Sequence, residues 1–264
     1  RQMSRIARLG EQFDVIAFAP YFLHRIHGSE RPLAKDLFPP LTEEFRHAAT
    51  LIGPHRLAVA EVNLHSLKGS LPSPLRAGVV AGALSGTALA KRMTDLVAMG
   101  IVRQCAWVLA GFDVRAESDD GFIPLFGLAR DLGPTRRLRP TGLAIELLNS
   151  VIGGNMHLVS PHFPDLTALA FDRPNGWHLV VVSSRATSTE LTIHFPEKTA
   201  AAGTNAQTFA GLVDVRGMGL FHDRPWTTNE DGQNVSVTPL NAEKSRNSLT
   251  VSIPPYSTAA YLPK

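Results

Sequence analysis

The spacing of apolar positions along the chain changes once, just after residue 160. Before it, short continuous apolar runs alternate with longer stretches of helical pattern. The runs are FDVIAFA at 13–19, LAVAEVN at 57–63 and IVRQCAWVL at 101–109. Each is short enough to form a strand buried on both faces, although a polar pair interrupts the third. This order is typical of an α/β fold.

Helical segments separate and follow these runs. Three are predicted, at residues 41–51, from Pro74 to about residue 99, and at 141–152. Thr42 precedes two glutamates at the start of the first, as an N-cap residue does. A proline stands before the last segment and two glycines follow it, which is the expected punctuation of a helix. The order is therefore strand, helix, strand, helix, strand, with a final helix.

After Ser160 and Pro161 apolar and polar residues alternate with a period of two. Four strands are predicted, at 177–182, 190–195, 234–238 and 248–253. The segment from 199 to 232 is long for a connection and rich in glycine and polar residues, and we expect one or two further short strands in it. Strand after short strand predicts a β-sandwich.

Composition excludes several classes of protein. The 264 residues are 44% hydrophobic and 19% charged, which is typical of a folded protein. Basic residues (26) barely exceed acidic ones (23) and are spread along the chain, so we predict no nucleic-acid partner. No apolar run reaches the roughly 18 residues of a membrane span. A phosphate loop, a dinucleotide fingerprint and a nucleophile elbow are also missing, and no cofactor is predicted.

Glu61 is the leading candidate for chemistry. It ends an otherwise apolar strand, and carboxylates at the carboxyl ends of parallel strands are where barrel folds place catalytic groups. Asn63, two residues on, would orient that carboxylate or bind substrate. The alternative is that Glu61 begins a solvated loop and Asn63 is a turn residue.

Other candidates follow the first and third runs. Tyr21 would donate a hydrogen bond to a carboxylate, or pack its ring under the loop. His24 and His27 are close behind it and are interpreted as exposed loop histidines. No third ligand stands at metal spacing, so no metal is predicted. Trp107 is either a sugar-stacking platform or a core residue.

Two further features are interpreted as structural. Cys105 is the single cysteine, which excludes an internal disulfide, and its position within a strand predicts a small buried side chain. An acidic cluster after the third run is interpreted as a charged surface loop, with one member facing the site as the alternative. Its members are Asp113, Glu117, Asp119 and Asp120.

Several segments together resemble a known enzyme family. They are FDVIAFAPYF, RLAVAEVN, IVRQCAWVLAGF, RPTGLAIELLNSVIGG and the terminal VSIPPYSTAAYL. Their order is similar to the C-terminal half of retaining glycosidases built on a (β/α)₈ barrel, especially the family 51 α-L-arabinofuranosidases and clan relatives. The resemblance implies the last βα units of a TIM barrel over residues 1–157 and an antiparallel β-sandwich over 158–264.

The resemblance also implies roles for individual residues. Glu61-Val62-Asn63 looks like the family's Glu-Trp-Asn triplet, with valine in place of tryptophan, and Glu61 would then be the nucleophile. The family's sixth barrel strand ends in a His-aromatic-Tyr signature. Residues 14–21 look like it, with Tyr21 at the tyrosine position and Ala19 where the family has histidine. Tyr21, Asn63, His24 and Trp107 would bind substrate or shape the pocket.

One part of the family pattern is missing. The family's acid/base lies in an Asn-Glu pair at the end of the fourth barrel strand, and this sequence has no such pair. The resemblance therefore implies a second polypeptide that carries the N-terminal part of the barrel. The predicted activity is hydrolysis of a carbohydrate by that assembly. The alternative is a non-catalytic carbohydrate-binding or scaffolding protein derived from such an enzyme. The sequence leaves sugar, linkage, compartment and self-association open.

Overall fold

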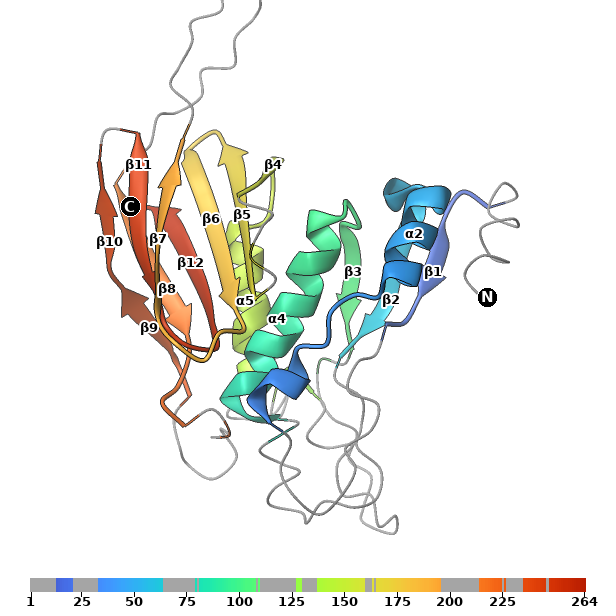
Figure 1. Ribbon diagram of the computed structural model, residues 1–264, viewed down its shortest axis with the longest axis horizontal. Helices are drawn as coiled ribbons and strands as arrows, with labels where there is room; N and C mark the ends of the chain where they lie inside the picture. Colours follow the sequence, from blue (N-terminus) through green and yellow to red (C-terminus); the bar gives the residue numbers. More distant parts are fainter. Residues whose placement is uncertain are drawn as a thin grey trace, which may run out of the picture.

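The chain folds into a parallel sheet, a pair of central helices and two antiparallel sheets, lying side by side in Figure 1. The computed structural model describes residues 13–20, 33–63, 79, 81–107, 109, 127–129, 137–159, 163, 165–195, 214–224, 226, 235–245 and 247–264. The mixed α/β class predicted from the sequence is confirmed. Among the described residues the parallel sheet has three strands and does not close into a barrel.

The parallel sheet has three strands. They are β1 (Ile16–Phe18), β2 (Leu57–Val62) and β3 (Arg103–Ala106), in the order β1-β2-β3. Ile16 pairs with Leu57, and Ala58 with Arg103. All three correspond to the predicted apolar runs; β1 and β3 are shortened at both ends, and β2 is shortened by one residue at its C-terminal end. Parallel pairing requires long crossover connections, and the helical segments supply them.

Helices α2 and α4 pack on one face of this sheet. Their bounds, with those of two short 3₁₀ helices, are η2 (Ala34–Leu37), α2 (Glu43–Ile52), η3 (Pro54–Arg56) and α4 (Ala83–Ala98). Thr42 caps α2 as predicted, because its hydroxyl oxygen accepts from the amide of Phe45 at 3.2 Å. Leu57 and Val59 of β2 share a buried cluster with Ala49 of α2 and Leu89 of α4. We call this side the covered face of the parallel sheet.

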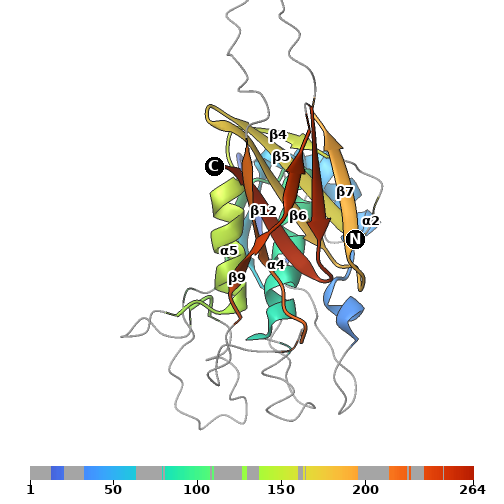
Figure 2. The same ribbon diagram turned by 90° about the vertical axis from the view of Figure 1, so that its left-hand side faces the viewer.

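The C-terminal part consists of two antiparallel sheets that share a core. The larger has the order β4-β5-β6-β12-β8-β9 and the smaller β10-β11-β7. The bounds are β4 (Asn155–Leu158), β5 (Leu166–Arg173), β6 (Gly176–Ser183), β7 (Thr189–His194), β8 (Val215–Leu220), β9 (Val237–Leu240), β10 (Ala242–Lys244), β11 (Ser248–Ile253) and β12 (Ser257–Pro263). Leu179 and Tyr261 of the larger sheet pack with Ile193 and Val251 of the smaller. Figure 2 shows these strands in front of the helices.

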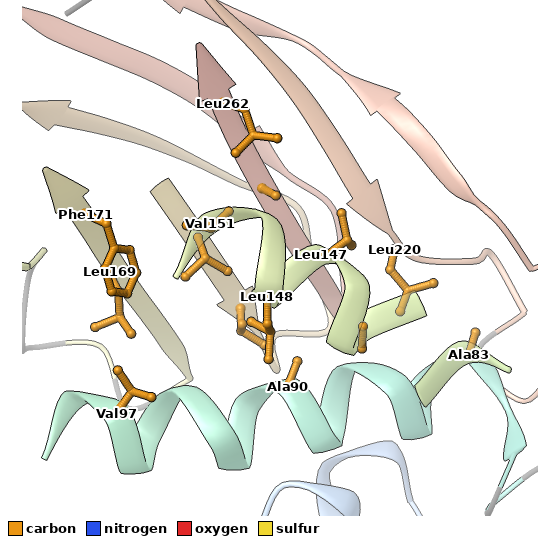
Figure 3. Packing of buried hydrophobic residues seen from close by; sticks show 14 of the residues in the cluster. Ala83, Ala90, Val97, Leu147, Leu148, Val151, Leu169, Phe171, Leu220 and Leu262 are labelled. Atoms are coloured by element: carbon orange, nitrogen blue, oxygen red, sulfur yellow. The ribbon is translucent and has the colours of Figure 1, made fainter. Parts of the chain in front are cut away.

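Helices α4 and α5 (Pro140–Val151) fill the space between the parallel sheet and the larger antiparallel sheet. Figure 3 shows Ala90 and Val97 of α4 beside Leu148 of α5, with Leu169 and Leu220 of the sheet above them. Gly86 permits the close approach of the helices, because a Cβ there would overlap the carbonyl oxygen of Pro140. One buried cluster thus joins residues from both sides of the predicted boundary at residue 157. The division into two domains stays a prediction.

Candidate functional site

An irregularity interrupts the pairing of β2 with β3 just before β2 ends. Val59 pairs with Gln104, whereas Val62 pairs with Ala106. Three steps along β2 therefore match two steps along β3, which is the count of a β-bulge. Glu61 lies inside this bulge.

The bulge takes Glu61 off the covered face. Strict alternation would place Glu61 on the same face as Leu57 and Val59, under the helices. Because of the extra residue it is Val62 that returns to the covered face, where it is completely buried. Ala60 is exposed and Glu61 is partly exposed. The carboxylate is thus kept out of the apolar core at the carboxyl end of a parallel strand.

Hydrogen bonds join the ends of β2 and β3 beyond the bulge. The amide of Trp107 donates to the carbonyl oxygen of Val62 at 3.1 Å. The side-chain amide of Asn63 donates to the carbonyl oxygen of Trp107, and Asn63 is only 3% exposed. Glu61, Asn63 and Trp107 therefore lie close together at one edge of the sheet. Trp107 is partly buried, which fits both interpretations of its ring.

The remaining predicted site residues lie outside the described residues. Tyr21 and His24 are among them, and so is the acidic cluster that begins at Asp113. Ala19, the position at which the resembling family has histidine, is described and exposed beyond the end of β1. The site as described therefore consists of three of the five predicted residues.

The prediction that Cys105 is buried is wrong. Its side chain is exposed, because β3 alternates between the covered face, which holds Gln104 and Ala106, and the opposite face. The apolar run around Cys105 predicts a strand buried on both faces. The helices pack on one face of this sheet, and Cys105 points to the other.

Sequence reasoning also missed the role of the polar pair in the third run. Arg103 is exposed and is paired in register with Ala58 on the uncovered side, whereas Gln104 turns inward and donates to the carbonyl oxygens of Met93 and Ile101 at 3.0 and 2.8 Å. The signal was present in Arg103, since a charged side chain is almost never buried without a partner and therefore indicates a face that is not covered. The bulge itself leaves no such mark in the sequence.

Within the described ranges no group of three or more histidine, cysteine, aspartate or glutamate side chains could hold a metal ion. No helix in those same ranges is long and apolar enough to cross a membrane.

Comparisons with known proteins place the fold. No protein-family model matches the chain, and no curated protein matches it in sequence. Solved structures do match. An α-L-arabinofuranosidase from Thermotoga maritima has a TM-score of 0.61 at 12% identity, over 98% of this chain and 54% of that one. A family 51 α-L-arabinofuranosidase from Bifidobacterium longum has a TM-score of 0.60 at 12% identity, with the same coverage.

A second glycoside hydrolase family is also similar. A family 30 endoxylanase from Clostridium papyrosolvens has a TM-score of 0.52 at 10% identity, over 96% of this chain and 49% of that one. The chain spans about half the length of the structures it matches, as the resemblance to a C-terminal half predicted. At such identities the likeness shows the fold, which is that of part of a glycoside hydrolase.

Proposed function

We propose that this chain is part of a retaining glycoside hydrolase and that Glu61 is its nucleophile. The single observation that carries the proposal is the bulge in β2. It keeps the Glu61 carboxylate off the covered face and at the carboxyl end of a parallel strand, where enzymes with this fold place catalytic groups.

In this mechanism the Glu61 carboxylate attacks the anomeric carbon as the leaving-group oxygen takes a proton from a second carboxyl group. The bond between the sugar and the leaving oxygen breaks, and a glycosyl ester of Glu61 forms. Water, deprotonated by the second group, then attacks the same carbon and releases Glu61. Retention requires the two carboxyl groups to lie about 5–5.5 Å apart. The acid/base belongs to sequence outside these 264 residues.

Residues next to Glu61 would position its carboxylate and the sugar. Asn63 is anchored to the backbone of Trp107, so its position near Glu61 is fixed by the fold. It would hold the nucleophile or a sugar hydroxyl, and Trp107 would shape the pocket. Tyr21 and His24, which follow the neighbouring strand, complete the predicted set.

The test is turnover of aryl α-L-arabinofuranosides and aryl β-xylosides by the assembly that contains this chain. Glu61→Gln keeps the shape of the side chain but removes the attacking charge, so we expect kcat to fall by several orders of magnitude, about 10³-fold or more. Azide should partly restore turnover to Glu61→Ala, because a small anion fits the vacated space and attacks in its place.

The matched control is Glu190→Gln, an exposed glutamate of β7 in the smaller antiparallel sheet. Its kcat should equal that of the wild type. Unchanged turnover in Glu61→Gln would refute the nucleophile. An assembly that binds sugars and hydrolyses none of these substrates would favour the non-catalytic carbohydrate-binding protein.

A further inference from the structure

Gln104 is a polar residue on the covered face of the parallel sheet, where packing alone favours an apolar one. It pairs with Val59 of β2, and Ala106, which follows it on the same face, packs against the apolar residues under the helices. The Oε1 atom of Gln104 is buried, and within the described part of the chain no group donates a hydrogen bond to it. A buried acceptor without a partner destabilises a fold. Such a residue therefore indicates a role other than packing.

The side-chain amide of Gln104 connects β3 to the end of α4. Its Nε2 donates to the carbonyl oxygen of Met93 in α4 at 3.0 Å and to that of Ile101, just before β3, at 2.8 Å. Figure 1 shows β3 lying next to α4. Because two carbonyl oxygens face this amide, turning it over would set Oε1 against both of them. The unpaired Oε1 is the consequence of using Nε2 for this connection.

The segment that Gln104 contacts is itself held in place. Gly100, after the end of α4, has a φ of +87°, a conformation that favours glycine at the end of a helix. The amide of Ile101 donates to the carbonyl oxygen of Leu96 at 3.0 Å, and Ile101 is completely buried. The hydrogen bonds of Gln104 therefore attach β3 to a fixed point and set its position along its own axis.

The bulge in β2 lies between two attachments of this kind. Gln104 fixes β3 at the last regular pair before the bulge. Beyond the bulge, the side-chain amide of Asn63 donates to the carbonyl oxygen of Trp107 and ties the end of β2 to β3. Ala60 and Glu61 lie between these two points. Pairing register belongs to both strands, so the extra residue of β2 stays at one place only while β3 is held on either side of it.

We propose that Gln104 is a positioning residue for Glu61. By fixing β3 against α4, it keeps the extra residue of β2 between Val59 and Val62, and this place decides where the Glu61 carboxylate lies. Gln104 acts only through the pairing of the strands and makes no contact with substrate. Its importance for catalysis rests on the proposed function of Glu61, whereas its effect on the position of residue 61 does not.

Gln104→Met tests the importance for catalysis. Methionine has a similar length and no donor, so the variant removes both hydrogen bonds together with the unpaired acceptor. We expect kcat of the protein that contains this chain to fall about 10–100-fold, because a displacement of about 1 Å at a reacting group suffices for such a loss. KM should stay within about twofold, since no group that binds the sugar is removed. Gln104→Glu keeps the shape of the side chain, lacks the amide donors and should show the same loss of kcat.

Thr94→Val is the matched control. The Thr94 hydroxyl is buried in α4 and donates to the carbonyl oxygens of Ala90 and Lys91, so this variant also removes buried hydrogen bonds to the backbone. Its kcat should equal that of the wild type. Denaturant unfolding should show that Gln104→Met is no less stable than Thr94→Val. A loss of kcat in the more stable variant alone is what a positioning role predicts and a merely structural role does not.

A thiol at position 61 reports where that residue lies without any assay of activity. Glu61→Cys in a Cys105→Ser background should react with a disulfide reagent, because position 61 is partly exposed. Adding Gln104→Met should slow the reaction at least about fivefold, since regular pairing turns residue 61 toward the covered face. Adding Thr94→Val should leave the rate unchanged.

The outcomes separate this inference from the proposed function. Where Glu61→Gln abolishes turnover, a wild-type kcat in Gln104→Met, or an equal loss of kcat in Thr94→Val, would overturn the positioning role. A thiol at position 61 whose reactivity does not depend on Gln104 would overturn it in every case. If Glu61→Gln keeps full turnover and the thiol still reacts more slowly in Gln104→Met, Glu61 is not the nucleophile, but Gln104 does fix its position.

Discussion

At the scale of single residues, His178 is a buried titratable group with hydrogen-bonding contacts on both ring nitrogens. The side chain is 5% exposed in β6. Its Nε2 lies 3.0 Å from Oδ1 of Asn175, and its Nδ1 lies 3.3 Å from Nη1 of Arg173. Nδ1 also lies 3.3 Å from the carbonyl oxygen of Ser150. A neutral ring with its hydrogen on Nε2 donates to Asn175 and accepts from Arg173 at Nδ1, whereas a protonated ring donates from Nδ1 to Ser150. Burial lowers the pKa of His178, and the nearby Arg173 charge lowers it further, against the carbonyl oxygen of Ser150, which raises it.

This lowered pKa predicts a loss of stability in mild acid. Because the unfolded chain takes up a proton at the ordinary histidine pKa of about 6.5 and the folded chain does so at lower pH, the unfolded state binds more protons in between. The free energy of unfolding contributed by this group therefore falls as the pH drops below about 6.5. Denaturant unfolding between about pH 7.5 and 5.5 measures it.

The variant His178→Gln isolates the effect. Its free energy of unfolding should be lower than that of the wild type at neutral pH, and the difference between the two should shrink as the pH falls. His194→Gln, at an exposed position of β7, should follow the wild type at every pH. A constant difference for His178→Gln would contradict the assignment.

Residues also show where sequence analysis reaches its limit. The strand that ends at Glu61 was predictable from its apolar run, and so was the edge of the sheet at which Glu61 lies. Which face the side chain takes depends on one extra residue relative to β3, and pairing register is a property of two segments. The predicted burial of Cys105 was wrong for a related reason, since an apolar run does not tell how many faces of a strand other elements cover.

At the scale of elements, the same limit explains which strands were missed. The ends of α2, α5 and β2 were predicted to within two residues, because caps, prolines and glycines mark them locally. For α4 the C-terminal end was predicted equally well, whereas the predicted start at Pro74 differs from the observed start at Ala83. β4, β5, β10 and β12 were missed. β5 and β12 each have one face in the core with the helices and the other in the core between the antiparallel sheets, so apolar and polar residues do not alternate in them. β6 is buried in the same way, but its three consecutive valines at 180–182 are themselves a strand signal.

A largely buried ion pair within α4 is hydrogen-bonded to the larger antiparallel sheet. Lys91 donates to both carboxylate oxygens of Asp95 at 2.7 and 2.8 Å, and the hydroxyl of Thr167 in β5 donates to Oδ1 at 2.5 Å. The Lys91 and Asp95 side chains are 10% and 18% exposed. Screening by water is weak at this exposure, so the pair is more than a surface contact.

Breaking one side of this pair should be costly. Asp95→Leu leaves the Lys91 charge without its carboxylate in a low-dielectric site, and we expect a loss of about 3–5 kcal/mol in the free energy of unfolding. Thr167→Val removes one hydrogen bond to a charged group and should cost about 1.5–3 kcal/mol. Denaturant unfolding at neutral pH measures both.

A double variant tests whether the loss of stability comes from the unneutralised Lys91 charge. Lys91→Met with Asp95→Leu removes both charges, and its stability should return to within about 1 kcal/mol of the wild type or exceed it. If the double variant is as unstable as Asp95→Leu, the carboxylate supports α4 through shape or hydrogen bonding rather than by neutralising Lys91.

At the scale of the whole molecule, α4 is the element that couples the parallel sheet to the antiparallel sheets. Almost every residue of α4 is buried, because one side packs on the parallel sheet and the other on α5 and the larger antiparallel sheet. Met93 of α4 and Ile145 of α5 pack against both clusters. Such a helix cannot leave one core without disturbing the other.

The turn between β11 and β12 adds a second link. Tyr256 adopts a positive φ of 45°, which is unusual for a residue other than glycine. The Thr87 hydroxyl of α4 donates to the carbonyl oxygen of Tyr256 at 3.0 Å. The Tyr256 ring stacks on the Phe38 ring, with the ring centroids 6.0 Å apart. A residue of the antiparallel part is thus fixed against the helices of the parallel part.

This coupling predicts that damage in the central cluster destabilises both parts of the chain. Leu148 of α5 is 1% exposed among residues of α4 and the larger antiparallel sheet. Leu148→Ala should lower the free energy of unfolding by about 2–5 kcal/mol, through lost burial and the cavity that remains.

Amide hydrogen exchange reports each part separately, in β2 and in β6. Protection should fall by the same factor in both, because α4 transmits the loss to the parallel sheet. Leu51→Ala, at an exposed position of α2, should change the free energy of opening measured in β2 and in β6 by no more than about 0.5 kcal/mol. Loss of protection confined to β6 would show that the parallel sheet and the antiparallel sheets unfold independently, in spite of the helix they share.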